Sequence, residues 1–178
     1  TSGEVRAGIV TGSSGALHTD RIAGFCDRIS ACYPRIRIIA EIENSDDDFE
    51  SYDKTRALLS AHPDINALYF TAAGVYGGCR AVLSLNRTDI HILAYDKIPA
   101  TKELMEQHII SAVICQQPAI QAKTIQLLFD YLTAGEAPDR EFIIPLWTFG
   151  FWKTCKRTAL LFAGCITSLQ FVIPMTDF

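Results

Sequence analysis

The sequence has no surplus of basic residues. It contains 16 Lys and Arg against 20 Asp and Glu, which gives a formal net charge of -4 over 178 residues. A nucleic-acid-binding domain normally shows a basic patch, so this composition argues against DNA contact by this stretch, though not by a segment elsewhere in a longer protein. With 49% hydrophobic and 20% charged residues, the chain has the composition of one globular domain rather than of a disordered protein.

Metal-binding patterns are also missing. There are only four histidines, and the six cysteines form no C-x-x-C pair, so a zinc site is not expected. Cys26, Cys79 and Cys115 lie inside apolar runs, where a free cysteine behaves as a small hydrophobic residue. Buried free thiols fit a reducing compartment, so we expect a cytoplasmic protein.

The sequence offers no pattern typical of an enzyme. The glycine-bounded loop at 12–15 lacks the Lys-Ser/Thr of a phosphate-binding loop. The acidic run ENSDDD at 43–48 lacks the Gly and closing Glu of a calcium loop, and we interpret it as a helix cap with a solvated face. Because no nucleophile–base pair or dinucleotide loop is found either, we expect no catalytic activity, no cofactor and no bound metal.

Strand and helix patterns alternate five times along the first 133 residues. Short apolar strands that alternate with helices predict a mostly parallel sheet with helices on both faces, which is a three-layer α/β/α fold. For the first helix we expect Thr19 or Asp20 as the cap. The expected strands are 5–11, 35–42, 66–71, 90–95, 111–115 and a short one at 141–145; the expected helices are 17–31, 48–61, 75–85, 100–107 and 118–133.

The helix at 118–133 is apolar around much of its circumference. Leu128 and Tyr131 belong to one stripe, and Ile125, Phe129 and Leu132 make another. A helix of this kind needs burial on more than one side. The sheet supplies one packing surface, so a second one is expected outside this stretch.

Polar residues follow the apolar strand runs at several points. Asp96 closes the run ILAYD, Gln116 closes AVICQQ, and Arg21 lies in the first turn of the first helix. Ligands of open parallel sheets bind outside the carboxyl ends of the strands, so these three side chains are candidate ligand contacts. Each has a structural alternative: Arg21 as an ion pair on its helix surface, Asp96 as a cap for the next helix, and Gln116 as a plain strand end.

The last 33 residues, 146–178, differ in character from the rest. The run at 158–175 carries no charged residue over 18 positions, a length that only reaches the lower limit for a membrane span. Three alternatives stay open for this segment: a membrane helix, a packed or strand-forming tail, and a sequence that was not selected for this fold, such as a read-through or frame-shifted end.

Four segments together resemble the sugar-binding domain of LacI/GalR-type transcription regulators, a fold shared with periplasmic sugar-binding proteins. They are RAGIVTGSSGALHTDRIAGF, NALYFTAAGVYGGCRAV, IHILAYDKIPA and IISAVICQQPAIQAKTIQLLFDYLTAGEAP. The resemblance implies one subdomain, residues 1–145, of a periplasmic-binding-protein-like type I fold. It also implies that helix 118–133 packs on a partner subdomain and that the first subdomain and a DNA-binding headpiece precede Thr1.

The resemblance also implies roles for individual residues. Arg21 matches an arginine that grips sugar hydroxyls, Asp96 an aspartate that accepts from two hydroxyls, and Gln116 a hinge-side glutamine. Many relatives carry Asn-Asp after the third strand, where this chain has Thr71 followed by two alanines. Thr71 is expected to substitute as a ligand contact, and Ser13 is a further loop candidate.

The function implied is effector sensing by a sugar-responsive regulator. A small sugar would bind in the cleft between two subdomains and change the DNA-binding state allosterically. The complete protein is expected to be a homodimer that contacts DNA only through the headpiece, without a membrane partner. The alternative is the sugar-binding component of a periplasmic transporter.

Overall fold

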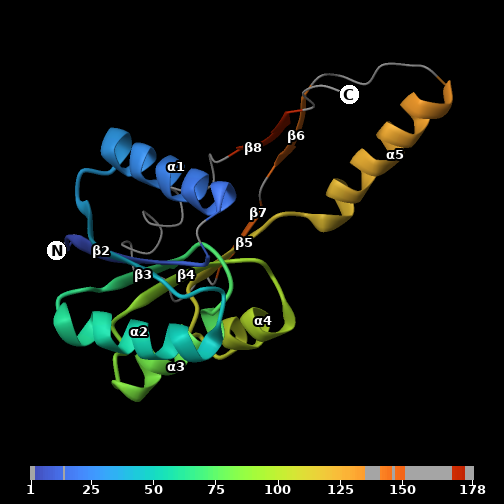
Figure 1. The fold of residues 1–178 in the computed structure, drawn as a ribbon. Helices are drawn as coiled ribbons and strands as arrows, with labels where there is room; N and C mark the ends of the chain where they lie inside the picture. Colours follow the sequence, from blue (N-terminus) through green and yellow to red (C-terminus); the bar gives the residue numbers. More distant parts are fainter. Residues whose placement is uncertain (1–2, 14, 135–140, 146, 151–169, 175–178) are drawn as a thin grey trace.

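The computed structural model describes residues 3–13, 15–134, 141–145, 147–150 and 170–174 (Figure 1). Its centre is a six-stranded sheet with the order β2-β1-β3-β4-β5-β7, in which the first five strands are parallel and β7 pairs antiparallel with β5. The strands are β1 (Val5–Thr11), β2 (Ile36–Glu43), β3 (Ala67–Phe70), β4 (His91–Tyr95), β5 (Ala112–Cys115) and β7 (Trp147–Gly150).

Helices cover both faces of this sheet, as the sequence predicts. Figure 1 shows α1 (Ala16–Cys32) over one face and α2 (Asp48–Ala61), α3 (Val75–Ser84) and α4 (Pro99–Glu106) over the other. Short apolar strands with helical crossovers favour this arrangement because a parallel sheet buries both of its faces. The three-layer, mostly parallel α/β fold is therefore confirmed.

Side chains alternate between two cores along each strand. In β3, Tyr69 packs on the α1 side, against Phe25 at 4.7 Å between ring centroids, whereas Phe70 packs on the side of α2 and α3. In β4, Leu93 and Ile92 divide in the same way. The twofold side-chain period of a strand produces this division. Because the first five strands are parallel, the residues that follow them lie at one edge of the sheet.

The helix starts are only partly as expected. α1 begins at Ala16, one residue before the expected start, with Gly15 at the cap position and no side-chain cap. The predicted cap at Thr19 or Asp20 is wrong; the Thr19 hydroxyl instead donates back to the Gly15 carbonyl. The cap predicted in the acidic run is confirmed, because the Asp47 carboxylate accepts a hydrogen bond from the Glu50 N–H at 2.8 Å.

The chain leaves the three-layer body after β5. α5 (Pro118–Ala134) projects away from the sheet (Figure 1), and its Ile125 and Phe129 side chains are 71% and 62% exposed. The strand expected at 141–145 is present as β6 (Glu141–Pro145), but it pairs antiparallel with β8 (Gln170–Pro174) in a separate two-stranded sheet. β7 and β8 both fall in the segment 146–178, and residues 151–169 lie outside the described part of the chain.

No helix in the described part of the chain has the length and apolar character needed to cross a membrane.

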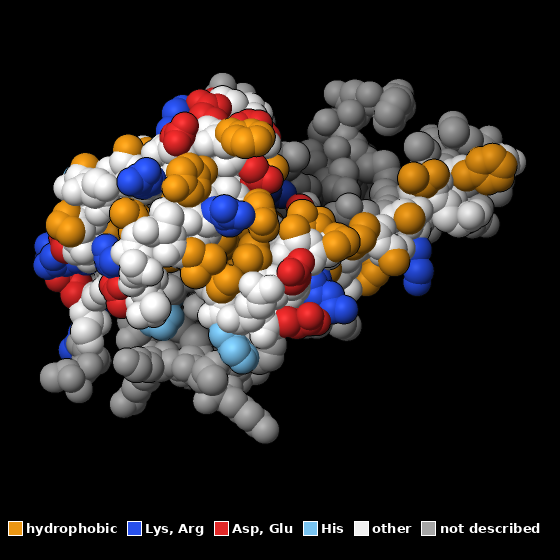
Figure 2. All heavy atoms as spheres, turned by 90° about the horizontal axis from the view of Figure 1, so that it is seen from below, with side chains coloured by type: hydrophobic (Ala, Val, Ile, Leu, Met, Phe, Trp, Pro, Cys, Tyr) orange, Lys and Arg blue, Asp and Glu red, His pale blue; other side chains and the backbone are white. Residues whose placement is uncertain are grey.

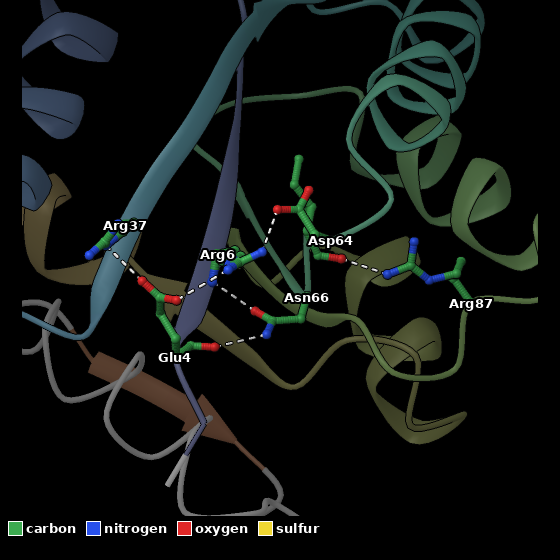
Figure 3. Close-up of polar contacts among 7 residues, drawn as sticks. Glu4, Arg6, Arg37, Asp64, Asn66 and Arg87 are labelled. Carbon is green, nitrogen blue, oxygen red and sulfur yellow. Dashed lines mark hydrogen bonds and ion pairs between the residues drawn. The ribbon is translucent and has the colours of Figure 1, made fainter.

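The amino-terminal edge of the sheet carries a network of paired charges (Figure 3). Arg6 contacts Asp64 at 2.6 Å and Glu4 at 3.3 Å, and Arg37 contacts Glu4 at 2.7 Å. Asn66 ties the network to the backbone by accepting from the Arg6 N–H and donating to the Glu4 carbonyl. These cations are solvent-accessible and lie beside carboxylates, which is the usual arrangement for structural surface charges.

Candidate functional site

Four parallel strands end at the opposite, carboxyl-terminal edge, and each presents a polar residue there. β1 ends at Thr11, while Thr71, Asp96 and Gln116 directly follow β3, β4 and β5. Because these strands are neighbours in the order β1-β3-β4-β5, the four side chains form one row. This row lies where ligands of open parallel sheets bind.

Asp96 and Gln116 contact each other directly. The Gln116 amide nitrogen Nε2 donates to both oxygens of the Asp96 carboxylate, at 2.7 and 3.0 Å. Asp96 has a positive φ of 65°, and its backbone N–H donates to the Ile114 carbonyl at 2.8 Å. A carboxylate has about four lone-pair sites, so the pair retains acceptor capacity toward hydroxyl groups.

The contacts of Asp96 and Gln116 differ from those of a helix cap and a plain strand end. Asp96 does not cap α4: the cap position is Ile98, and Thr101 bridges it by accepting from the Ile98 N–H and donating to the Asp96 carbonyl. Gln116 is not a plain strand end, because its amide orients the neighbouring carboxylate. The side chains of both residues are thus held toward the same edge.

Arg21 reaches this edge from the first turns of α1. Its side chain is only 9% exposed, Nη1 donates to the Thr71 carbonyl, and the guanidinium carbon lies 4.1 Å from the centre of the Tyr95 ring. The Arg21 Nε is buried and has no hydrogen-bond partner among the described residues. The helix-surface ion pair with Asp20 or Asp27 is not formed.

Within the described ranges, Arg21 also makes no ion pair with any other carboxylate. It thus differs from Arg6 and Arg37 at the amino-terminal edge, which are exposed and paired (Figure 3). Burying a charge without a countercharge costs several kcal/mol, so the position is energetically unusual unless a ligand supplies acceptors.

The Tyr95 ring packs against the Arg21 guanidinium. The ring is 4% exposed and lies 6.1 Å from the Tyr69 ring, which in turn packs on Phe25. Burial raises the pKa of the Tyr95 hydroxyl. A neutral, rigid aromatic face beneath a guanidinium provides a cation–π contact that fixes the orientation of the guanidinium.

Thr71 and Ser13 are at the edge but are already engaged. Thr71 is fully buried, and its hydroxyl donates to the Thr11 hydroxyl at 3.0 Å. Ser13 is exposed, but its N–H and hydroxyl both donate to the Asp46 carboxylate, at 3.0 and 2.9 Å. Thr71 therefore reaches Arg21 through its carbonyl, and Ser13 is held by the loop after β2.

The site carries no metal-ligand cluster: no group of three or more His, Cys, Asp or Glu side chains in the described residues could hold an ion. Cys26, Cys32, Cys79 and Cys115 are free thiols. A hollow of about 420 Å³ lies on the face formed by α2 and α3, which is turned toward the viewer in Figure 2. Its lining includes Phe49, Tyr76 and Arg80 and none of the five predicted site residues.

The model of the family described as "Periplasmic binding protein domain" matches residues 2–137. The chain belongs to this family. No curated protein matches the sequence, but solved structures do. GanP, a glucose-galactose binding protein from Geobacillus stearothermophilus, is 25% identical with a TM-score of 0.75, over 83% of this chain and 53% of that chain.

Two further structures extend the comparison. AraP, an arabinose binding protein from Geobacillus stearothermophilus, is 24% identical with a TM-score of 0.69, over 77% of this chain and 48% of that chain. A solute binding protein of an ABC transporter from Burkholderia graminis, in complex with D-arabinose, is 19% identical with a TM-score of 0.75, over 83% of this chain and 53% of that chain. This periplasmic-binding-protein domain thus spans about half the length of these structures.

These similar structures are sugar- and solute-binding proteins rather than LacI/GalR regulators, so the comparison supports the shared fold and not the narrower resemblance. Three residues of the edge escaped sequence analysis: Thr11, Asp46 and Tyr95. Thr11 and Tyr95 end apolar strands, and position alone could have marked them. Asp46 was counted with the acidic helix cap, and nothing local distinguishes it from Asp47.

Proposed function

We propose that this domain forms one half of a sugar-binding cleft. Arg21, Asp96 and Gln116 would contact the hydroxyls directly, while Thr71 and Ser13 hold Arg21 and the first loop in place. The observation that carries the proposal is the buried Arg21 guanidinium, which has a rigid aromatic support and no countercharge within the described part of the chain. A guanidinium offers a planar fork of donors for paired oxygens, and Asp96 accepts from hydroxyl donors beside it.

The proposed unit is residues 1–145, with α5 packed on a second, facing subdomain. The tail at 146–178 adds β7 to the edge of its sheet and pairs β8 with β6. The exposed Ile125 and Phe129 side chains support this division, since an apolar helix face is normally buried. The coverage of about half of each similar structure agrees with one subdomain of two. Closure of two subdomains on a sugar is a hinge motion of a common type. We propose binding rather than catalysis, with no cofactor.

Between the two whole-protein roles, we favour the sugar-binding component of a transporter. The similar structures support this choice, since their names include an arabinose binding protein, a glucose-galactose binding protein and an ABC transporter solute binding protein.

The second candidate is the effector domain of a LacI/GalR-type regulator. Four free cysteines in the described residues favour it, because free thiols fit a reducing cytoplasm better than an oxidising periplasm. In that role the protein would be a cytoplasmic homodimer that contacts DNA through a headpiece. The coding sequence upstream of Thr1 separates the two candidates: a secretory signal supports the transporter component, and a helix-turn-helix supports the regulator.

Calorimetric titration of the complete protein tests sugar binding. We would titrate D-glucose, D-galactose, D-arabinose and D-allose into the wild type and into Asp96→Asn. The variant keeps the size of the side chain but removes the charge. The affinity for a sugar that the wild type binds should therefore fall at least tenfold, because the loss of a charge-assisted hydrogen bond costs about 1.4 kcal/mol or more. Asp89→Asn, on the amino-terminal side of β4, is the control and should bind normally. Equal affinity of Asp96→Asn and wild type would remove Asp96 from the site.

The 178-residue chain alone should bind these sugars weakly or not at all, because it supplies only half of the proposed contacts. Strong binding by this chain would instead place the complete site within it.

A further inference from the structure

The loop between β2 and α2, residues 44–47, sends side chains into both neighbouring loops of the carboxyl-terminal edge. Asn44 is fully buried; its Nδ2 donates to the Ala73 carbonyl at 2.9 Å, and its Oδ1 accepts from the Asp46 N–H at 3.0 Å. Asn44 therefore fixes the position of Asp46 relative to the turn after β3.

Both oxygens of the Asp46 carboxylate are used, and they are used by different loops. Oδ2 accepts from the N–H and the hydroxyl of Ser13, at 3.0 and 2.9 Å, in the loop after β1. Oδ1 accepts from the Ala73 N–H at 3.2 Å, in the turn after β3. Asp46 thus bridges the two loops that flank Thr11 and Thr71, whose hydroxyls contact each other at 3.0 Å.

The backbone conformation at Ser45 and Asp46 and the absence of a side chain at Gly12 allow this bridge to form. Asp46 has a φ of 60° and Ser45 a φ of 51°, both in the left-handed region that non-glycine residues rarely adopt. A Cβ atom on Gly12 would lie 2.2 Å from Asp46 Oδ1 and 2.7 Å from the Ala72 Cβ. Glycine at position 12 is therefore required for the carboxylate to reach Ser13.

The electrostatics agree with the geometry. Hydrogen bonds from the Ser13 backbone lower the pKa of the Asp46 carboxyl, with further contributions from the Ser13 hydroxyl, the Ala73 N–H and the charge of His18. The carboxylate is therefore charged at neutral pH, and its hydrogen bonds are of the stronger, charge-assisted type.

We propose that Asp46 is a positioning residue for the sugar-binding edge, which holds the loop after β1 and the turn after β3 at one fixed spacing around Arg21. The Ala73 turn follows Thr71, whose carbonyl receives the Arg21 guanidinium, so the turn that Asp46 holds also sets the acceptor that orients Arg21. This inference rests on the proposed function for its consequence in binding. The bridge itself is a property of this chain and can be tested without any sugar.

The first test measures amide hydrogen exchange by NMR on the 178-residue chain. The Ser13 and Ala73 N–H groups donate to the Asp46 carboxylate, so Asp46→Ala should speed exchange at both by about tenfold or more, the scale of one charge-assisted hydrogen bond. Asp46→Asn should free only one of them, because an amide has a single acceptor oxygen and its NH2 group faces the other donor. Unchanged protection of both amides in Asp46→Ala would overturn the proposal.

Asp47→Asn is the matched control. It makes the same change in charge at the next residue, and asparagine caps a helix as well as aspartate does. Protection at Ser13 and Ala73 should therefore stay as in the wild type. Equal acceleration in Asp46→Asn and Asp47→Asn would show a general charge effect and would also overturn the proposal.

The second test measures sugar affinity in the complete protein by calorimetry, together with the free energy of unfolding. For a sugar that the wild type binds, the affinity of Asp46→Asn should be about tenfold lower than that of the wild type. The affinity of Asp47→Asn should stay within about twofold of the wild-type value, and all three proteins should unfold at similar urea concentrations. Wild-type affinity in Asp46→Asn would overturn the positioning role. If the wild type binds none of the sugars, the proposed function fails, and the exchange experiment alone then decides whether Asp46 bridges the loops.

Discussion

Replacing Arg21 with methionine separates a ligand-binding role from a structural one. Arg21 is 9% exposed, donates to the Thr71 carbonyl and lies over the Tyr95 ring, without a carboxylate partner among the described residues. Methionine keeps an unbranched, apolar side chain of similar length. The substitution thus removes the charge and the donors with little change in packing.

Opposing contributions nearly cancel in this variant. The lost hydrogen bond from a charged donor is worth about 1.5–3 kcal/mol, and the lost cation–π contact about 0.5–2 kcal/mol. Removing a buried guanidinium recovers a desolvation penalty of several kcal/mol. We therefore expect the unfolding free energy of Arg21→Met to lie within about 1 kcal/mol of the wild-type value, on either side.

A structural arginine would behave differently. If the charge were well accommodated by the protein itself, its removal would recover no desolvation penalty, and the lost hydrogen bond and cation–π contact together would cost about 2–5 kcal/mol. Urea unfolding followed by circular dichroism distinguishes these outcomes, provided that the m-value is unchanged. Arg28→Met, on the same helix, is the control for helix propensity. A loss above about 3 kcal/mol for Arg21→Met alone would refute the assignment of Arg21 to ligand binding.

Two further predictions concern the same chain. Burial raises the pKa of the Cys79 thiol to about 12, whereas Cys32 is exposed. Because the thiolate is the reactive form, iodoacetamide at pH 8 should modify Cys32 readily and leave Cys79 unmodified until the chain unfolds. Peptide mass spectrometry measures both modification rates, and equal rates would contradict the burial of Cys79. We also expect the chain to self-associate through α5, where Phe129 is 62% exposed. Sedimentation velocity should show a monomer for Phe129→Asp, whereas the control Phe49→Asp, on α2, should still self-associate. A monomeric wild type at high concentration would contradict this prediction.

The sequence predicts the three-layer body well because its strands are short and apolar and its helices are amphipathic. These patterns arise because a parallel sheet is buried on both faces. They are visible within short segments of the sequence, so they can be recognised without knowledge of contacts between distant residues. Asp96, Gln116 and Arg21 could be found for the same reason: each lies where a strand ends or the following helix begins. The error at the start of α1 arises because Gly15 serves as a cap without a side chain, so no polar residue marks it.

Contacts between loops could not be predicted in this way. Asp46 and Asp47 are adjacent and chemically identical, yet one bridges two loops and the other caps α2. The difference depends on the left-handed backbone at Ser45 and Asp46, which places one carboxylate toward Ser13 and the next toward its own helix. The pairing of β7 with β5, and of β6 with β8, depends likewise on contacts between distant segments.

The backbone conformation points to the same edge of the sheet independently of the side chains. Six described non-glycine residues have positive φ. Asn86 and His108 follow the ends of α3 and α4, where a left-handed residue commonly terminates a helix. The other four, Ser45, Asp46, Asp96 and Gln117, all follow strands at the carboxyl-terminal edge. Each such residue costs about 1–2 kcal/mol, and strain of this kind is retained mainly at functional sites. Their shared location therefore supports a binding site at the edge where Arg21 is buried without a countercharge.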